Sequence, residues 1–274
     1  MTTHSFELAE FITTTIRRLV TEASASPEAG STEYREPLIG FASADDPRFS
    51  ELQRVVHPTH MLPSDLLPGA RSVVSFFLPF APWVVEANAR HREQVAHEWV
   101  VAYVETNALI GRINSYLIES LTEARPQSRI GGIRAAAEPA THNFDPQTLV
   151  SRWSHKSVAV IAGLGSFGLH QLVITDAGCA GRFGSLVLDA ELPVESVKAA
   201  NSGSQERCLY YADGSCLECV MRCPANALSE DEPLDKQRCW YRCQAVAEAF
   251  RDIGLAEVCG KCAVGPCSVA SAVL

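Results

Sequence analysis

Long apolar segments and basic residues are scarce in this sequence of 274 residues. It has no run of about 18 apolar residues, the length that a membrane-spanning helix needs, so we expect no membrane span. Lys and Arg number 23 against 32 Asp and Glu, which gives a formal net charge of −9 and disfavours nucleic acid as a partner. The chain starts without an apolar or twin-arginine leader, so we expect a cytoplasmic protein without disulfides.

Histidine is also missing where cysteine is concentrated. No histidine follows His170, whereas nine of the ten cysteines come after residue 200. Eight of these cysteines form two groups with short spacings, and Pro224 directly follows the last member of the first group. The first group is Cys208, Cys216, Cys219 and Cys223, and the second is Cys239, Cys259, Cys262 and Cys267.

The segment from Cys216 to Pro224 is close to the end of the bacterial ferredoxin pattern C-x2-C-x2-C-x3-C-P. Thiolates are soft ligands that suit iron–sulfur clusters, and two-residue gaps let neighbouring sulfurs bind one cluster. The sequence therefore predicts two 4Fe–4S clusters in a bacterial-ferredoxin-like module. Such clusters carry single electrons, so reductive chemistry is expected.

In two-cluster ferredoxins the cysteine before the proline binds the other cluster, so the two groups interlock. This rule predicts Cys216, Cys219 and Cys267 around one cluster. It places Cys223, Cys239, Cys259 and Cys262 around the second. The first cluster then lacks one ligand, for which Cys208 is the natural candidate and Asp213, at the position where the pattern expects a cysteine, is the weaker one.

Zinc is the alternative reading, because two C-x2-C pairs can form a tetrahedral zinc site. The Cys-Pro signature and the large number of cysteines favour iron–sulfur clusters. Two cysteines remain outside the ligand sets. Cys243 follows Cys239 by four residues on a predicted helix and is assigned to packing, and Cys179 lies in a Gly-rich turn and is assigned a structural role.

The rest of the chain mixes helices and strands. Apolar spacing predicts helices over residues 6–23, 97–124 and 146–155, with a loop over 24–35. Buried strands are predicted at residues 72–78, 172–175 and 186–188. This order predicts an α/β sandwich over residues 1–200, followed by the ferredoxin-like domain over residues 201–274.

One glycine motif matches a dinucleotide-binding pattern, but its surroundings argue against that function. Residues 163–168 match the dinucleotide-binding pattern G-x-G-x-x-G, and residues 158–161 before them could pass for a strand. The pattern requires a helix directly after the glycines, because its N-terminal amides hold the pyrophosphate. The sequence after His170 instead predicts a strand and a turn, which argues against a nicotinamide site. The glycines equally suit a tight loop against another ligand.

Four sequence blocks carry a resemblance to the epoxyqueuosine reductase family of cobalamin- and iron–sulfur-dependent reductases, relatives of the reductive dehalogenases. The blocks follow one another from about residue 60 onward. They are Leu66-Leu-Pro-Gly-Ala-Arg-Ser-Val73, Ala162-Gly-Leu-Gly-Ser-Phe-Gly168, Arg182-Phe-Gly-Ser-Leu186 and, in the cysteine region, Leu234-Asp-Lys-Gln-Arg-Cys239.

The resemblance implies a base-off cobalamin between an α/β domain and the clusters. Electrons would come from a reduced ferredoxin or flavodoxin through both clusters to cobalt. By matching position, the corrin would be lined by Gly163, Gly165, Ser166, Gly168, Gly184 and Ser185. Family members continue into a helical-repeat domain that helps to hold tRNA, whereas this sequence stops seven residues after Cys267, so we expect a small-molecule substrate.

The family's proton donor is an aspartate before the glycine loop. The comparable stretch here contains Asp145, the first candidate for the catalytic acid, and His142, the second. Desolvation beside a corrin would raise the pKa of the aspartate towards neutrality. Equally, Asp145 before Pro146 could cap the next helix. His155 and His170 are assigned structural roles.

These observations favour a cobalamin-dependent reductase that acts on a small molecule. The second hypothesis is a non-catalytic redox or cobalamin-handling protein that reduces bound corrinoid, or passes electrons to a partner. A third is a ferredoxin-like module on an α/β domain that binds a flavin or nothing.

Overall fold

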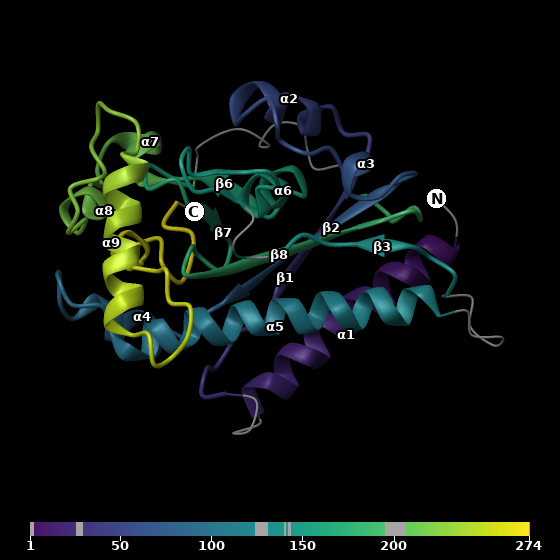
Figure 1. Ribbon diagram of the computed structural model, residues 1–274, viewed down its shortest axis with the longest axis horizontal. Coiled ribbons are helices and arrows are strands. Elements are labelled where there is room, and N and C mark those ends of the chain that lie inside the picture. The colour runs from purple at the N-terminus through teal and green to yellow at the C-terminus, as the bar shows by residue number, and fades with distance from the viewer. Residues whose placement is uncertain are drawn as a thin grey trace.

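The computed structural model describes residues 3–25, 30–123, 131–139, 141, 144–194 and 207–273. At its centre lies a four-stranded antiparallel sheet in the order β1-β2-β8-β3 (Figure 1). Helices cover both faces, which confirms a mixed α/β fold. The strands are β1 (Leu38–Ser43), β2 (Ser72–Pro79), β8 (Gly181–Leu188) and β3 (Ala135–Ala136).

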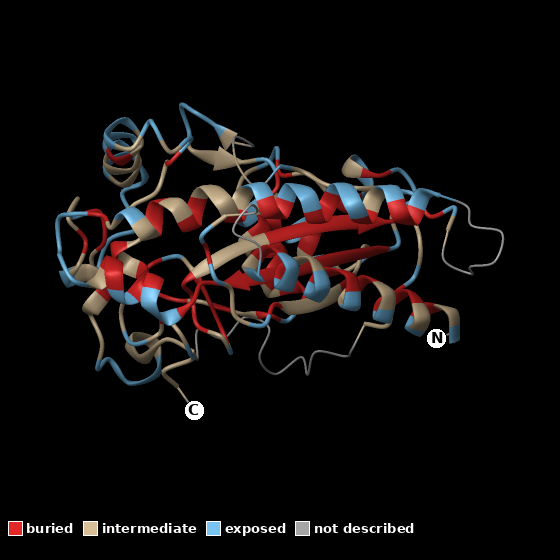
Figure 2. Ribbon diagram, turned by 90° about the horizontal axis from the view of Figure 1, so that it is seen from below, coloured by how far each residue is buried: buried red, intermediate tan, exposed pale blue. Residues whose placement is uncertain are grey.

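One face of the sheet packs against two long helices, α1 (Thr3–Ala25) and α5 (His97–Thr122). Alternate side chains of β2, among them Val74 and Phe76, enter this core, because successive side chains of a strand point to opposite faces. All eight residues of β2 are buried. Figure 2 shows the strands buried between helices whose outer surfaces are exposed.

The other face packs against α6 (His155–Ile161), and α2 (Pro47–Val55) packs on α6 in turn. Trp153 is fully enclosed there and stacks on the ring of Phe49, with ring centroids 6.1 Å apart. Short elements complete this side of the molecule: α3 (Pro63–Leu66), and the two-stranded ribbons β4 (Phe144–Asp145) with β5 (Val150–Ser151) and β6 (Gly165–Phe167) with β7 (Val173–Thr175).

One local prediction is wrong, and the structure decides a second segment that the sequence left open. The segment 146–155 is a turn followed by β5, not a helix, because the Asp145 carboxylate accepts hydrogen bonds from the backbone N–H groups of Gln147 and Thr148 and closes a turn. Residues 158–161 belong to helix α6, which Ser154 caps by accepting a hydrogen bond from the Ser157 N–H at 3.2 Å. An apolar run of four residues is compatible with a helix or with a strand, so the capping residue decides which of the two forms.

The glycine motif is not a dinucleotide-binding turn. Gly163 has a φ of 79° and follows the end of α6, where a left-handed glycine commonly ends a helix. Strand β6 follows and pairs antiparallel with β7, so no helix follows the glycines to hold a pyrophosphate. The expected strand and turn after His170 are confirmed.

The cysteine-rich region gathers at one end of the molecule beside α4 (Pro82–Ala89) and the start of α5, as Figure 1 shows on the left. Residues from α4, α5 and α9 share one buried core there. The proposed domain boundary near residue 200 lies outside the described residues. The remaining elements are α7 (Leu209–Asp213), α8 (Glu218–Met221), α9 (Lys236–Ala249) and η1 (Lys261–Ala263). In the described part of the chain, no helix combines the length and the apolar character that crossing a membrane requires.

Candidate metal centre

Cysteines from both ends of the cysteine-rich region meet around a small cavity of about 20 Å³. Its cysteine lining is Cys208, Cys216, Cys219 and Cys267, with Cys262 at the side that faces the second group. Burial raises the pKa of Cys219 to about 12, and the nearby sulfurs of Cys267, Cys208 and Cys216 add to this effect. Four thiols so close together become thiolates only when a cation compensates their charge, which is what a metal centre does.

A larger cavity of about 250 Å³ adjoins the first. Its lining includes Cys223, Cys239, Cys259 and Cys262, together with Cys243. Burial is the main cause that raises the pKa of Cys262, followed by the nearby Cys239 and Cys259 sulfurs. A hydrogen bond with Cys243 lowers the pKa of Cys239 to about 7.

The four predicted ligands of each cluster thus line one cavity, although Cys262 lines both cavities and Cys179 and Cys243 also line the larger one. All ten cysteines lie in the described part of the chain and are free thiols there. Their role as ligands of iron–sulfur clusters stays a prediction.

Of the two candidates for the eighth ligand, the structure brings Cys208 to the small cavity. Asp213 is exposed and outside the residues that line it. The Asp213 carboxylate accepts a hydrogen bond from the Ser215 N–H at 2.9 Å, and this local turn lowers its pKa. Asp213 therefore stabilises the turn after α7.

Backbone pairing holds the C-terminal segment against the turn after β7. The Cys179 N–H donates to the carbonyl of Cys267 at 2.9 Å, and the Ala180 N–H donates to that of Ser268 at 2.9 Å. Gly178 has a φ of 80°, and any Cβ at this position would collide with the Ser268 backbone. Gly178 is therefore needed for the close approach that brings Cys267 to the cavity.

A single arginine from the N-terminal half ties the same segment to the sheet. The Arg35 guanidinium donates to the carbonyls of Val269 at 2.7 Å, Ala177 at 2.6 Å and Phe80 at 3.0 Å. Its planar group with several N–H donors suits three fixed acceptors, which a lysine could not serve equally. Arg35 thus connects three segments that are far apart in the sequence.

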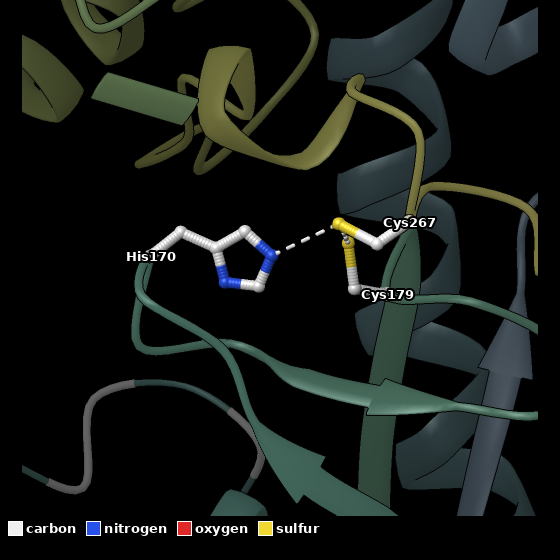
Figure 3. A group of neighbouring side chains, drawn as sticks. All are labelled: His170, Cys179 and Cys267. Atoms are coloured by element: carbon white, nitrogen blue, oxygen red, sulfur yellow. Dashed lines mark hydrogen bonds between the residues drawn. The ribbon is translucent and has the colours of Figure 1, made fainter. Parts of the chain in front are cut away.

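Figure 3 shows His170, Cys179 and Cys267 as one group, whose ligand atoms all lie within 4.8 Å of one another. The His170 Nε2 lies 3.4 Å from Cys267 Sγ, and Cys179 Sγ lies 3.9 Å from it. The hydrogen bond from Cys179, and then that from His170, lowers the pKa of Cys267 to about 5. The pKa of Cys179 is raised by the same contact and by burial.

The larger cavity carries buried hydrogen-bond donors without partners among the described residues. These are the indole Nε1 of Trp99 and the guanidinium Nε of Arg242, and both residues line the cavity. Unpaired buried donors are costly, so their presence points to an acceptor that occupies the cavity. Sulfide and thiolate sulfurs of an anionic cluster are acceptors of this kind, and the donor set therefore fits such a cluster.

Cations also face the larger cavity. Lys261 lies between Cys259 and Cys262 in the sequence and is only 2% exposed; its ammonium donates to the side-chain oxygen of Asn88 at 2.9 Å and also to the Asn88 carbonyl. Burial lowers its pKa to about 8. Lys156 of α6 lies near the thiols of Cys262 and Cys239, and burial lowers its pKa as well. These cations would offset the negative charge of a thiolate-bound cluster.

A further cavity of about 260 Å³ lies between the cysteine-rich end and the sheet. It shares five lining residues with the larger cavity, so the two adjoin: Lys156, Leu172, Cys179, Gly181 and Arg182. Trp153 and Phe183 supply aromatic walls. None of the described residues that line it is acidic, whereas two are basic.

His155 lines this cavity with a fully satisfied ring. Its Nε2 lies 3.2 Å from the Pro139 carbonyl, to which it can only donate, so Nδ1 accepts from the Ser185 hydroxyl at 2.8 Å. Ser185 also accepts from the Trp153 Nε1 at 2.9 Å. The neutral ring meets all these requirements, and burial lowers the pKa of His155 to about 4.

This buried histidine makes stability depend on pH. The unfolded chain binds a proton at His155 below pH about 6.5, whereas the folded chain binds it only below about 4. Stability is therefore lost as the pH falls through this window, by about 3 kcal/mol. Urea unfolding at several pH values should show a flatter dependence for His155→Gln than for the wild type. The same slope in both would contradict the assignment, and His91→Gln, at an exposed position, is the control.

The residues predicted to line a corrin lie close together but face the protein itself at several points. The Cα of Gly165 faces the Ile174 carbonyl, that of Gly168 faces the His170 ring, and that of Gly184 faces the Phe76 ring. The Ser185 hydroxyl forms hydrogen bonds with Trp153 and His155, whereas the buried Ser166 hydroxyl has no hydrogen-bond partner among the described residues. The contact of these residues with a cofactor stays a prediction.

The candidate acid Asp145 is exposed, and it lines none of the three cavities. Hydrogen bonds from the Thr148 N–H at 2.7 Å, the Thr148 hydroxyl at 3.0 Å and the Gln147 N–H at 2.9 Å lower its pKa. The expected rise of its pKa is therefore wrong for this geometry. The second candidate, His142, lies outside the described residues.

Several residues of the site escape local sequence reasoning. Trp99 is one of the regularly spaced apolar residues of a predicted helix, and Lys156 and Arg35 belong to no recognisable sequence motif. Lys261 alone had a visible signal, because it lies inside a C-x2-C pair. His170, assigned a structural role from sequence, lies in contact with a predicted ligand.

Comparison with known proteins identifies distant relatives of this chain. The chain is a distant homologue of the epoxyqueuosine reductases. The enzyme of Salmonella typhimurium is 28% identical over 197 residues, which cover 70% of this chain and 45% of the relative. That of Escherichia coli is 29% identical over 178 residues, or 65% of this chain and 41% of the relative. The chain thus spans less than half the length of these curated relatives. No protein-family model matches the chain.

The solved structures that are similar to this chain include an epoxyqueuosine reductase with an epoxyqueuosine-modified tRNA stem loop. The structural alignment covers 94% of this chain and 66% of that reductase, with a TM-score of 0.49 and 20% sequence identity.

Proposed function

We propose that this protein is a reductase that holds two 4Fe–4S clusters and passes their electrons, one at a time, to a base-off cobalamin in the adjoining cavity, where a small molecule is reduced. The observation that carries the proposal is that the eight predicted ligand cysteines, all free thiols, line two neighbouring cavities. Distant homology to the epoxyqueuosine reductases supports the same class of chemistry.

The lining of the cysteine cavities supports clusters over zinc. Eight thiols in two interlocked sets match the ligand number of two 4Fe–4S clusters. A zinc site commonly takes four ligands and needs none of the buried donors of Trp99 and Arg242. The two clusters would take the net charge from −9 to about −13, which the cations Lys261 and Lys156 offset locally.

The cavity of about 260 Å³, beside the cavity of the second cluster, suits the edge of a flat macrocycle with amide side chains. When bound, cobalamin supplies a cobalt centre that accepts single electrons and reacts in its reduced state. Trp153 and Phe183 would give the ring an apolar surface, and the hydroxyls of Ser151 and Ser154 lie on the same wall. Lys156 and Arg182 would orient an anionic group.

The substrate and the electron donor follow from charge and from the one-electron chemistry. An acidic protein is poorly suited to a phosphate backbone, which supports a small-molecule substrate over tRNA. A reduced ferredoxin or flavodoxin suits the clusters, because each delivers electrons singly.

An anaerobic reconstitution followed by a cobalamin titration tests the proposal. We expect about eight iron atoms per chain and two interacting cluster signals in electron paramagnetic resonance. Visible absorption and paramagnetic resonance should then report stoichiometric cobalamin binding with a base-off cobalt signal. Zinc uptake without iron would contradict the cluster assignment. Two normal clusters without cobalamin binding would contradict the cobalamin assignment and leave an electron-transfer protein.

A further inference from the structure

His170 is oriented by its second ring nitrogen. The Leu172 N–H donates to His170 Nδ1 at 3.1 Å, so Nδ1 is an acceptor and carries no proton in the neutral ring. The proton is therefore on Nε2, which points at Cys267 Sγ 3.4 Å away (Figure 3). His170 is only 4% exposed, and the short loop between β6 and β7 holds it in place.

Cys179 is held next to the same sulfur. It is 4% exposed, and its backbone pairs with the carbonyls of Cys267 and Ser268. The contact of 3.9 Å between the two sulfurs is within the range of a hydrogen bond that involves sulfur. Cys179 belongs to neither set of four thiols, so its S–H can donate to the Cys267 thiolate.

We propose that His170 and Cys179 are paired hydrogen-bond donors to the Cys267 sulfur that set the reduction potential of the first cluster. This inference rests on the proposed function, in which Cys267 is a ligand of that cluster. Hydrogen bonds to ligand sulfurs stabilise the reduced cluster more than the oxidised one, because reduction adds negative charge that spreads onto the sulfurs. One electron enters the cluster, and both donors keep their protons.

The arrangement is specific to the first cluster. The cavity of the second set is faced by the ammonium of Lys261, the guanidinium of Arg242 and the indole of Trp99. His170 lines both cavities and Cys179 lines the larger one, but both contact the sulfur of Cys267, which lines only the small cavity. Loss of these two donors should therefore shift the first cluster and leave the second unchanged.

Four variants in two matched pairs test the proposal in the iron-reconstituted chain. His170→Leu and Cys179→Ala remove a donor, whereas His170→Gln and Cys179→Ser keep one. Redox titrations followed by electron paramagnetic resonance should show a lower potential of the first cluster in the Leu and Ala variants. At a fixed solution potential, we expect its reduced-to-oxidised ratio to fall by about tenfold, which corresponds to 59 mV for one electron. The Gln and Ser variants should remain close to the wild type.

Each other outcome overturns the proposal. An unchanged potential in both Leu and Ala variants would show that the donors do not tune the cluster. Equal shifts within a matched pair would show that the effect does not pass through a hydrogen bond. Loss of half the iron in the Leu and Ala variants would make the two side chains necessary for holding the cluster. Iron content of the wild type tests the proposed function separately, since it does not depend on the two donors.

Discussion

Replacement of Cys219 with serine is expected to remove one cluster and to lower the iron content of the reconstituted chain by about half. Cys219 lines the small cavity with Cys208, Cys216 and Cys267, so its loss leaves three predicted ligands for the first cluster. The four predicted ligands of the second cluster are unaffected, because Cys219 does not line the larger cavity. Iron and sulfide analysis with paramagnetic resonance should show a single remaining cluster without coupling to a second.

Cys243→Ser is the matched control. Cys243 lines the larger cavity but is outside the predicted ligand sets, so its replacement should leave the iron content unchanged. Full iron content in Cys219→Ser, or half in Cys243→Ser, would show that the ligand sets are wrong. In the latter case Cys243 would be the ligand in place of Cys239, which lies one helical turn away on α9.

Replacement of Arg35 with methionine is expected to lower the free energy of unfolding by about 3–5 kcal/mol. The change removes three charge-assisted hydrogen bonds and leaves the carbonyls of Phe80, Ala177 and Val269 without this donor. Urea unfolding of the iron-loaded chain measures the loss. The C-terminal segment should also exchange its amide protons faster, because its tie to the sheet is broken.

Arg17→Met provides the control on the surface. Arg17 forms an exposed ion pair with Glu36 at 2.6 Å, and such pairs contribute little in water. Its replacement should change the free energy of unfolding by less than about 0.5 kcal/mol. A similar loss in both variants would contradict a special role of Arg35.

The contacts of Arg35 also bear on the metal centre. Val269 lies two residues after Cys267, and Arg35 holds its carbonyl from 234 positions away in the sequence. The Gly178 turn approaches Ser268 from the other side. The small cavity is thus completed only when the N-terminal half of the chain has folded, so the clusters and the α/β part depend on one another.

Some elements of this protein could be read from sequence because their signals are local. The spacing of apolar residues places helices at α1 and α5, and a continuous apolar run places the buried strand β2. Cysteine spacing, together with the interlocking rule of two-cluster ferredoxins, predicts two ligand sets, and the members of each set line one of two neighbouring cavities. A strand and turn after His170 exclude the dinucleotide reading of the glycines.

Short segments were misread where a side chain overrides the apolar pattern. The Asp145 carboxylate closes a turn in place of a predicted helix, and the Ser154 cap starts a helix where a strand was possible. The same turn keeps Asp145 exposed and lowers its pKa, contrary to the rise expected of a buried acid. Local hydrogen bonds of this kind depend on geometry that residue types alone do not specify.

The sequence by itself determined which cysteines are candidate ligands, because the short C-x2-C spacings are a local property. Only the tertiary structure decided what surrounds their sulfurs. His170 reaches Cys267 across 97 positions and Cys179 reaches it across 88, while Trp99 points an unpaired N–H into the cavity of the second set. Such contacts arise from the packing of segments far apart in the chain, and no local pattern records that packing.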